Sequence, residues 1–312
     1  MSEMKKIPTR DSYGAALAEA AKDYPNLIVM DADLSCATKT EEFAKVCPER
    51  FFNAGIAEAN MVCVAAGLAA AGMIPFVSSF AMFTAGRAFE QIRNSVAYPK
   101  LNVKIGATHA GISVGEDGAS HQCIEDIALM RVLPNMTVLS PSDDIEARAC
   151  VKAALDLDGP VYLRLGRAAV PVINGADYHF EIGKGQLLKE GKDVTIVATG
   201  LLVSICLEAA ELLKNEGIDA EVINICSIKP LDEELILASA AKTGRVVTAE
   251  EHLIAGGLGG AVAEVLSAKL PTKLTRIGME DRFGESAPAE ALLEKFGFTP
   301  AAVCARVKEA CR

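Results

Sequence analysis

Short apolar runs alternate with longer segments of mixed or small residues along most of the chain. In the first half the apolar runs predict strands at Leu27–Met30, Phe51–Ala54, Ile74–Ser79, Asn102–Ala107, Thr137–Ser140 and Val161–Leu165. Between and before them, helices are predicted at Asp11–Lys22, Ala57–Ala71, Phe83–Ala97, Ile124–Arg131 and Asp143–Leu155. This alternation favours a parallel sheet that is covered by helices on both faces.

The pattern loosens between Val170 and Gly191, where glycine and polar residues are frequent, and we place a domain boundary near Gly175–Ile182. Beyond it, strands are predicted at Val194–Ala198, Ala220–Ile225, Arg245–Glu250 and Lys273–Ile277. Helices are predicted at Ser204–Glu216, Asp232–Thr243, Gly257–Lys269 and after Pro288 and Pro300. The sequence therefore predicts an α/β protein with two open, mostly parallel sheets, in domains at residues 1–175 and 183–312.

Composition narrows the class of protein. The chain has 312 residues, of which 51% are hydrophobic, and this is enough for two domains with cores of their own. No charge-free apolar run reaches the roughly 18 to 20 residues of a membrane span. The first residues lack the apolar stretch of a secretory signal, so we expect a cytoplasmic protein. A net charge of −10 with dispersed basic residues opposes binding to nucleic acid or anionic membranes.

The nine cysteines are scattered singly, without a CxxC pair or a metal-ligand spacing. This usage predicts reduced thiols that act as small apolar residues in a reducing compartment. Cys123 lies two residues after His121, a separation at which side chains rarely face each other. A catalytic pair of these two residues is therefore not expected.

Candidate chemistry is concentrated between Phe51 and Asp126. Glu58 falls in the first turn of a helix that is apolar on nearly all faces, so we expect this helix to be buried all round. The positive end of the helix favours the charged carboxylate, whereas burial favours the neutral acid. A carboxyl group between these states is suited to sharing a proton with a ring nitrogen. The structural alternative is an ordinary glutamate that stabilises the helix end.

Three segments carry a family resemblance: GIAEANMVCVAAGLAAAG, PFVSSFAMF and THAGISVGEDGASHQ, followed by LPNM at Leu133–Met136. Together they resemble the pyrimidine-binding part of thiamine-diphosphate enzymes, and most closely transketolase. The resemblance extends over essentially the whole chain, as the pyrimidine-binding and C-terminal domains of a transketolase without its N-terminal, diphosphate-binding domain. It implies transfer of a two-carbon ketol unit from a ketose phosphate to an aldose phosphate, as in the pentose phosphate pathway.

The resemblance implies a role for several residues of the cofactor site. Glu58 would bond the far ring nitrogen of the cofactor's aminopyrimidine, Phe83 would stack on that ring, and Phe80 would lie beside it. A stacked aromatic pair contributes about 0.5 to 1.5 kcal/mol beyond burial. Core packing is the alternative for both phenylalanines, and it is as good an explanation for Phe80. Asp33 matches an aspartate that lies against the cofactor at the subunit contact.

The same resemblance assigns the sugar-phosphate site. His109 and His121 would contact the substrate, with His121 near the reacting carbonyl and so catalytic, and Asp117 would bind a substrate hydroxyl. Arg167 matches an arginine that binds the substrate phosphate, which a guanidinium can do through two hydrogen bonds. The neighbouring Arg164 is expected to be structural.

Two positions depart from the family pattern. Where the family has a phosphate-binding serine this chain has Ala37, and the sequence leaves open whether Thr38 replaces it. Gly86 stands where the family has an aromatic residue, which predicts a looser pyrimidine pocket on that side.

The metal-binding segment of thiamine-diphosphate enzymes is missing as well. Gly115–Gly118 reads GEDG, but no asparagine follows at the required distance, so no metal ligand is predicted in this chain. We therefore expect an N-terminal transketolase subunit to hold the diphosphate and its Mg²⁺ or Ca²⁺. Self-association of both chains would then give a heterotetramer with active sites at interfaces.

Other readings stay open. The rival enzymes are the beta subunit of a 2-oxo acid dehydrogenase and a synthase that makes deoxyxylulose phosphate; a catalytically silent, transketolase-like scaffold is the alternative outside enzymes. In the second domain, Ala249–Leu266 resembles the C-terminal domain shared by transketolases and 2-oxo acid dehydrogenase beta subunits. Glu250 and His252 are weaker candidates for a ligand site there.

Overall fold

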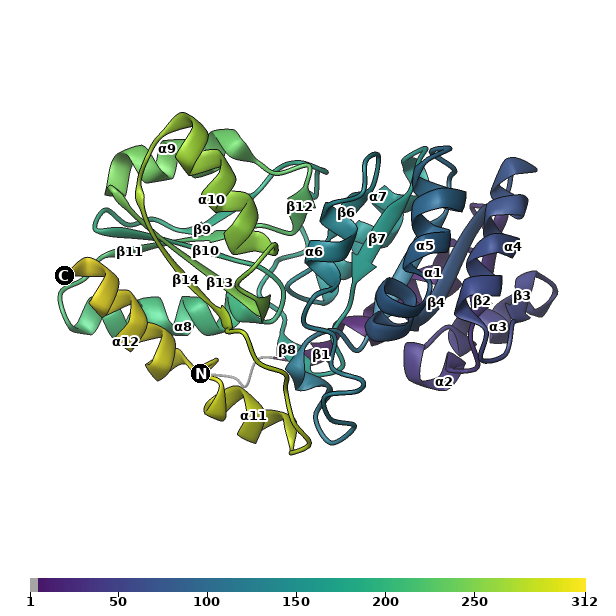
Figure 1. Ribbon diagram of the computed structural model, residues 1–312, viewed down its shortest axis with the longest axis horizontal. Coiled ribbons are helices and arrows are strands. Elements are labelled where there is room, and N and C mark those ends of the chain that lie inside the picture. Colours follow the sequence, from purple (N-terminus) through teal and green to yellow (C-terminus); the bar gives the residue numbers. More distant parts are fainter. Residues whose placement is uncertain (1–4) are drawn as a thin grey trace.

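The computed structural model describes residues 5–312. It consists mainly of two sheets with helices on their faces, which confirms the α/β class expected from the sequence. Figure 1 shows the first sheet in purple to teal and the second in green to yellow, next to each other. The strands of the first sheet lie in the order β12 (Ser227–Lys229), β6 (Thr137–Leu139), β7 (Val161–Arg164), β5 (Lys104–Thr108), β4 (Ile74–Phe80), β2 (Leu27–Asp31) and β3 (Phe51–Asn53). Those of the second lie in the order β14 (Lys273–Met279), β13 (Arg245–Leu253), β10 (Val194–Ala198), β11 (Ala220–Asn224) and β9 (Gln186–Lys189).

Within each sheet the strands expected from the sequence pair in parallel, and one edge strand that was not predicted pairs antiparallel. In the first sheet that edge strand is β12, which comes from the second half of the chain and pairs with β6. The second half therefore completes the sheet of the first half. A small additional sheet joins β1 (Lys6–Pro8) to β8 (Ala169–Pro171) and ties the two ends of the first half together.

Apart from the segment Phe83–Ala97, the predicted helices are present with shifts at their ends, and two short helices, α2 and α3, were not predicted. Those of the first half are α1 (Thr9–Ala20), α2 (Ser35–Thr38), α3 (Glu41–Val46), α4 (Glu58–Ala70), α5 (Phe89–Gln91), α6 (Asp126–Arg131) and α7 (Asp144–Asp156). Those of the second half are α8 (Leu202–Asn215), α9 (Glu233–Thr243), α10 (Leu258–Lys269), α11 (Ala289–Lys295) and α12 (Pro300–Cys311). Aspartates placed just before two of them cap the first turn: Asp143 accepts from Glu146 N at 2.9 Å and Asp232 from Leu235 N at 3.1 Å. Among residues 5–312 no helix is both long and apolar enough to cross a bilayer.

The first sheet has a core on each face, because alternate residues of its strands point to opposite sides. In β4, Phe76 packs into the cluster that contains Tyr13 and Leu17 of α1, and Val77 into the cluster that contains Met61 of α4. All seven residues of β4 are buried. Fully burying a side chain such as Phe76 contributes about 1.5 to 3 kcal/mol, so both helical layers hold the strand in place.

Helix α4 differs from the expectation that it is buried on every side. Glu58 and Met61 face the protein, but Cys63, Val64 and Gly67 are exposed, and Val64 retains 44% of its accessible surface. The pattern of small apolar residues predicts that the helix is buried on every side. It does not show which face of the helix a single chain leaves uncovered. An apolar helix face that remains exposed is typical of a contact surface for another chain.

The segment predicted as one helix at Phe83–Ala97 is irregular. It consists of a π-helical turn, η2 (Met82–Arg87), the short α5 and a second π-helical turn, η3 (Ile92–Ala97). A π-helical turn inserts one residue per turn and changes the direction of the side chains that follow, and such turns are frequent at functional sites. Here it directs Phe83 and Arg87 of η2 toward the start of α4.

Candidate active site

Glu58 is the first residue of α4 and lies beneath the end of β4. Its side chain is 1% exposed, and both of its carboxylate oxygens accept from Arg87 Nη1, at 2.9 and 3.1 Å. The hydroxyl of Ser79, in β4, donates to the same carboxylate at 3.4 Å. Glu58 is therefore buried, as expected, and a guanidinium that the sequence did not single out covers its open side.

A stack of rings lies next to this pair. Phe80, the last residue of β4, is stacked against Phe83 with ring centroids 5.8 Å apart and against His109 at 3.8 Å. The ring of His121 meets Phe83 edge-on at 5.3 Å. The guanidinium of Arg87 lies 4.4 Å from the centre of the Phe83 ring. The structure thus brings together residues that are separated by up to 63 positions in the chain, at the carboxyl ends of β4 and β5.

His109 is held as a neutral imidazole. Arg10 Nη1 lies 2.9 Å from its Nε2, and because arginine only donates, Nε2 is the acceptor and Nδ1 carries the proton toward Thr108 Oγ1 at 2.9 Å. Burial, together with the charges of Arg10 and Arg167, lowers the pKa of His109 to about 3. At neutral pH this side chain therefore accepts from a cation on one side and donates to a hydroxyl on the other.

Arg10 was missed by the sequence analysis. It lies at the start of α1, 99 positions before His109, and also donates to the backbone oxygen of Ala37 at 3.2 Å. Burial lowers its pKa, and its Nε has no hydrogen-bond partner among the residues that the structure describes. No local motif distinguishes this arginine in the sequence, since only the tertiary fold places it against His109.

Arg167 and Asp117 lie on the outer side of the same site. Arg167 donates to the backbone oxygen of Val114 and lies 3.4 Å from Glu116, while its side chain stays 37% exposed. Asp117 is exposed on the loop after β5. The positive charges of Arg10 and Arg167 both contribute to lowering the pKa of His109, so the described part of the site is positively charged on one side. Asp117 is not drawn into the ring cluster.

The segment after β2 bears on the question about Thr38 that the sequence left open. Thr38, considered as a replacement for a phosphate-binding serine, is fully buried, and its hydroxyl donates to Asp31 at 2.6 Å. Because that hydroxyl is engaged inside the protein, it is not offered to a ligand. Asp33 is exposed, with a φ of 66°, and is hydrogen-bonded with Asn53 of β3 on the outer edge of the sheet.

The expected gap beside Gly86 is occupied. A Cβ built on Gly86 would come within 2.2 Å of the terminal methyl of Met82, so the methionine fills the space that an aromatic side chain would use. Methionine packs readily into such irregular spaces because its side chain is unbranched and flexible. The pocket wall at this position is a flexible side chain rather than an opening.

Glu250 and His252, in the second half of the chain, form hydrogen bonds with other groups of the protein. Glu250 accepts from the first amides of α10, Leu258 N and Gly259 N, both at 2.7 Å. His252 is fully buried, with Nδ1 donating to the Leu253 oxygen and Nε2 accepting from Ala128 N. These bonds account for the polar atoms of both side chains, so the weaker hypothesis of a ligand site there finds no open group.

Arg164 is buried, and it bonds to other groups of the protein. Its Nε lies 2.9 Å from Asp126, its Nη2 donates to the Glu251 oxygen at 2.8 Å, and it is 7% exposed. Glu251 in turn accepts from Ser113 N at 2.5 Å, in the loop that carries the candidate substrate residues. The bond between Arg164 and the Glu251 oxygen therefore links the first sheet to the second half, and the bond between Glu251 and Ser113 fixes that loop. Among residues 5–312, no cluster of histidine, cysteine or acidic side chains is arranged as metal ligands, and all nine cysteines are free.

Comparison with known families decides the classification. Residues 5–172 match the transketolase pyrimidine-binding domain, and residues 183–303 match the transketolase C-terminal domain. The chain belongs to the transketolase family. The expectation drawn from the sequence motifs is thereby confirmed.

Some relatives have nearly the same length as this chain, whereas others are about twice as long. A chain from Methanocaldococcus jannaschii named as a transketolase C-terminal section is 53% identical over 96% of this chain and 95% of its own length. A 6-deoxy-6-sulfo-D-fructose transketolase subunit of Clostridium sp. is 46% identical over 93% of this chain and 90% of its own length. The 1-deoxy-D-xylulose-5-phosphate synthase of Caldanaerobacter subterraneus is 39% identical, but this chain covers only 46% of it.

Solved structures show the same relation. A split-gene transketolase, described as an inactive beta4 tetramer, superposes with a TM-score of 0.92 at 58% identity over 98% of both chains. The transketolase of Campylobacter jejuni superposes with a TM-score of 0.83 at 26% identity, and this chain covers 47% of it. This chain therefore spans nearly all of the split-gene chain but less than half of the Campylobacter transketolase.

Proposed function

We propose that this chain is the pyrimidine-binding and C-terminal subunit of a split transketolase, which transfers a two-carbon ketol unit from a ketose phosphate to an aldose phosphate. The observation that carries the proposal is the position of Glu58, a carboxylate that is 1% exposed and adjoins the stacked rings of Phe83 and Phe80. Glutamates are rarely fully buried unless they are paired, and the partner of Glu58 is Arg87, a half-exposed side chain that a ligand can displace.

The residues present fit the pyrimidine end of thiamine diphosphate. A buried carboxylate can bond a ring nitrogen, and Phe83, which is partly exposed, offers a flat face to the ring. When bound, thiamine diphosphate supplies a stabilised carbanion at its thiazolium carbon. Glu58 would bond the ring nitrogen of the aminopyrimidine and so favour one of its tautomers. Because Arg87 occupies both oxygens of Glu58, it must share or leave them when a ring nitrogen bonds there.

The positive side of the site supports a phosphorylated sugar as substrate. Arg10 and Arg167 both act on His109, and an arginine can bind a phosphate through two hydrogen bonds. We assign His109, Asp117 and Arg167 to substrate binding and add Arg10 as a second candidate for the phosphate. His121, which meets Phe83 edge-on, is assigned to proton exchange at the reacting carbonyl.

A second subunit is part of the proposal. Three apolar side chains at the edge of the first sheet are exposed, Phe52 at 48%, Ile56 at 75% and Val64 at 44%, next to Asp33 and the start of α4. We infer that an N-terminal transketolase subunit holds the diphosphate and its Mg²⁺ or Ca²⁺, in a cytoplasmic heterotetramer of both chains. The split-gene neighbour forms a tetramer of its beta chain alone that is inactive, which supports the need for another chain.

Synthesis of deoxyxylulose phosphate is the second candidate, since a synthase of that product is 39% identical over 92% of this chain. The two reactions differ in the donor, which is pyruvate for the synthase and a ketose phosphate for a transketolase. An assay with each donor therefore separates them. A silent scaffold would be inactive with both donors.

The test uses the native complex, isolated by pull-down of this chain with its companion subunit. We expect ketol transfer by the complex and a loss of at least ~10²-fold in turnover for Glu58→Ala, the magnitude of acid–base catalysis. The control is Glu208→Ala, an exposed glutamate of α8, which should leave turnover unchanged. If Glu58→Ala assembles normally and retains near-normal turnover, the proposed role of Glu58 is wrong.

A further inference from the structure

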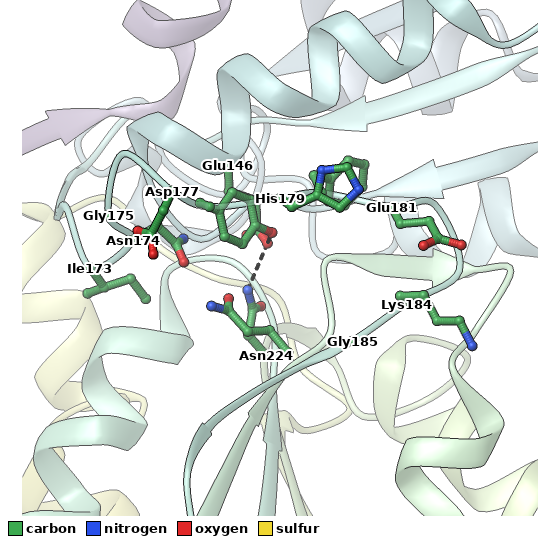
Figure 2. Close-up of a pocket in the computed structure, with 13 residues that line it drawn as sticks. Glu146, Ile173, Asn174, Gly175, Asp177, His179, Glu181, Lys184, Gly185 and Asn224 are labelled. Atoms are coloured by element: carbon green, nitrogen blue, oxygen red, sulfur yellow. Dashed lines mark hydrogen bonds between the residues drawn. The ribbon is translucent and has the colours of Figure 1, made fainter.

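A second cavity lies where the two halves of the chain meet, and it shares no residue with the site around Glu58. It has a volume of about 360 Å³ and is bounded by Glu146 of α7, by the connecting segment 173–186 and by Asn224 at the end of β11. We call it the junction pocket. Figure 2 shows Asn224 bonded to Glu146, with Asn174 and Asp177 on one side of this pair and Glu181 and Lys184 on the other.

Three residues that line this pocket have buried polar atoms without partners. Asn174 is 9% exposed and Asn224 is 1% exposed. Both side-chain atoms of Asn174, the Oδ1 of Asn224 and the Oε1 of Gln186 make no hydrogen bond with any residue the structure describes. A buried polar atom without a partner costs about 1 to 3 kcal/mol, so four around one cavity are unusual. Their concentration at one place indicates a site built for a polar ligand.

The orientation of Asn224 is fixed by its neighbour. Its Nδ2 donates to Glu146 Oε1 at 2.8 Å, so the free atom must be the acceptor Oδ1 (Figure 2). Glu146 also accepts from Tyr178 at 2.5 Å and from both Ser142 N and Ser142 Oγ at 2.7 Å. With four donors, this carboxylate needs no ligand, and the open groups of the pocket are the neutral amides.

The charge of the lining selects against anions. Three carboxylates, Glu146, Asp177 and Glu181, face one ammonium group, that of Lys184, which already lies 3.5 Å from Glu234. A phosphate or carboxylate ligand would meet net negative charge here, in contrast to the site beside Arg10. A hydroxyl group, which both donates and accepts, can pair with either end of Asn174 and with the oxygens of Asn224 and Gln186.

We propose that the junction pocket is a binding site for an uncharged polyhydroxylated compound of monosaccharide size, such as a sugar or a polyol without phosphate. Asn174 binds through both ends of its amide, and Asn224 and Gln186 accept from ligand hydroxyls. The partly exposed rings of Tyr178 and Phe180 cover the apolar face of the ligand, which its C–H groups form. Because Glu146 and Asn224 come from different halves of the chain, an occupied pocket would join the two halves.

The experiment measures binding of D-sorbitol to the full chain by saturation-transfer difference NMR, with D-gluconate as the negatively charged molecule of matched size. We expect sorbitol to bind and gluconate to bind at least ~10-fold more weakly. Asn174→Leu should weaken sorbitol binding by at least ~10-fold, since it removes both hydrogen bonds of the amide to the ligand. The variant should fold, because the wild-type side chain of Asn174 bonds nothing in the protein.

Two further variants complete the test. Gln186→Met, at the other end of the pocket, should weaken sorbitol binding several-fold, and it replaces Asn174→Leu if that variant fails to fold. His109→Ala, in the candidate active site, should leave sorbitol binding unchanged, so the result does not depend on the proposed transketolase activity. The inference is overturned if sorbitol does not bind at about 100 mM, if gluconate binds as well as sorbitol, or if His109→Ala but neither pocket variant weakens binding. A crystal soaked in sorbitol that shows only water in the pocket would equally overturn it.

Discussion

Arg87 donates through one nitrogen to both carboxylate oxygens of Glu58, at 2.9 and 3.1 Å, while its guanidinium lies 4.4 Å from the centre of the Phe83 ring. The arginine side chain is 49% exposed, whereas the glutamate is 1% exposed. One half-exposed cation thus supplies the countercharge of the buried acid and covers the aromatic surface beside it. We infer that Arg87 keeps Glu58 in position until a ligand ring takes over the contact.

Removing this cation should destabilise the fold. Arg87→Met leaves the buried carboxylate without its countercharge, and we expect a loss of about 1 to 2 kcal/mol in the free energy of unfolding. This is less than for a fully buried pair, because Arg87 is half exposed and partly screened by solvent. Urea unfolding measures the loss, and adding Glu58→Gln should recover part of it. Arg93→Met, an exposed arginine of η3, serves as control and should change the free energy by less than ~0.5 kcal/mol. Equal losses in both variants would contradict the inferred pairing.

Much of the fold could be predicted because local patterns determine it. The strands β2, β4 and β10 are short, mostly apolar and buried throughout, as is typical of parallel strands that are covered on both faces. Asp143 and Asp232 mark the starts of α7 and α9 through their capping bonds. In both cases neighbouring residues carry the information.

Features that depend on distant contacts could not be predicted. β12 has only three residues and is a strand because β6 pairs with it, 88 positions or more earlier in the chain. Arg10 becomes part of the site only by meeting His109, and Arg87 only because a π-helical turn directs it toward Glu58. The exposure of Val64 is likewise hidden, since a small apolar residue predicts contact but not whether the contact lies within the same chain.

His109 should make stability depend on pH in the acidic range. Its pKa is about 3 in the folded chain, through burial and the charges of Arg10 and Arg167, and about 6.5 when unfolded. Between these values the unfolded chain binds a proton that the folded chain does not, so stability falls as the pH falls from 6.5 toward 3, by up to ~1.4 kcal/mol per pH unit. This contribution is fully present above pH 6.5.

The pH prediction is tested by comparison with His109→Gln. Urea unfolding at pH 6.5 and pH 5 should show a fall in the free energy of unfolding that is smaller in the variant by about 1 to 2 kcal/mol. Carboxylates whose pKa is raised by burial, such as Glu146 and Glu250, contribute equally to both proteins and cancel. His179→Gln, which changes an exposed histidine, should keep the wild-type dependence. Parallel curves for wild type and His109→Gln would show that His109 is not held neutral.

Gly111 links the candidate substrate loop to the second half of the chain. Its backbone has a φ of 82° and a ψ of −174°, a conformation open almost only to glycine, and a Cβ added there would come within 2.3 to 2.6 Å of the Glu251 carboxylate. Gly111→Ala must therefore displace Glu251 from its bond with Ser113 or move the loop that follows His109.

We expect Gly111→Ala to lower the free energy of unfolding by more than ~2 kcal/mol, the sum of backbone strain and the displaced buried carboxylate. Gly217→Ala is the matched control, because Gly217 has a nearly equal φ of 83° but nothing within 4 Å of its added Cβ, and should cost about 1 kcal/mol. Urea unfolding measures both. Ketol transfer by the native complex should fall in Gly111→Ala alone, since only that substitution disturbs the loop between His109 and His121. If the two alanine variants lose equal stability and both keep full activity, Glu251 does not position the substrate loop through this contact.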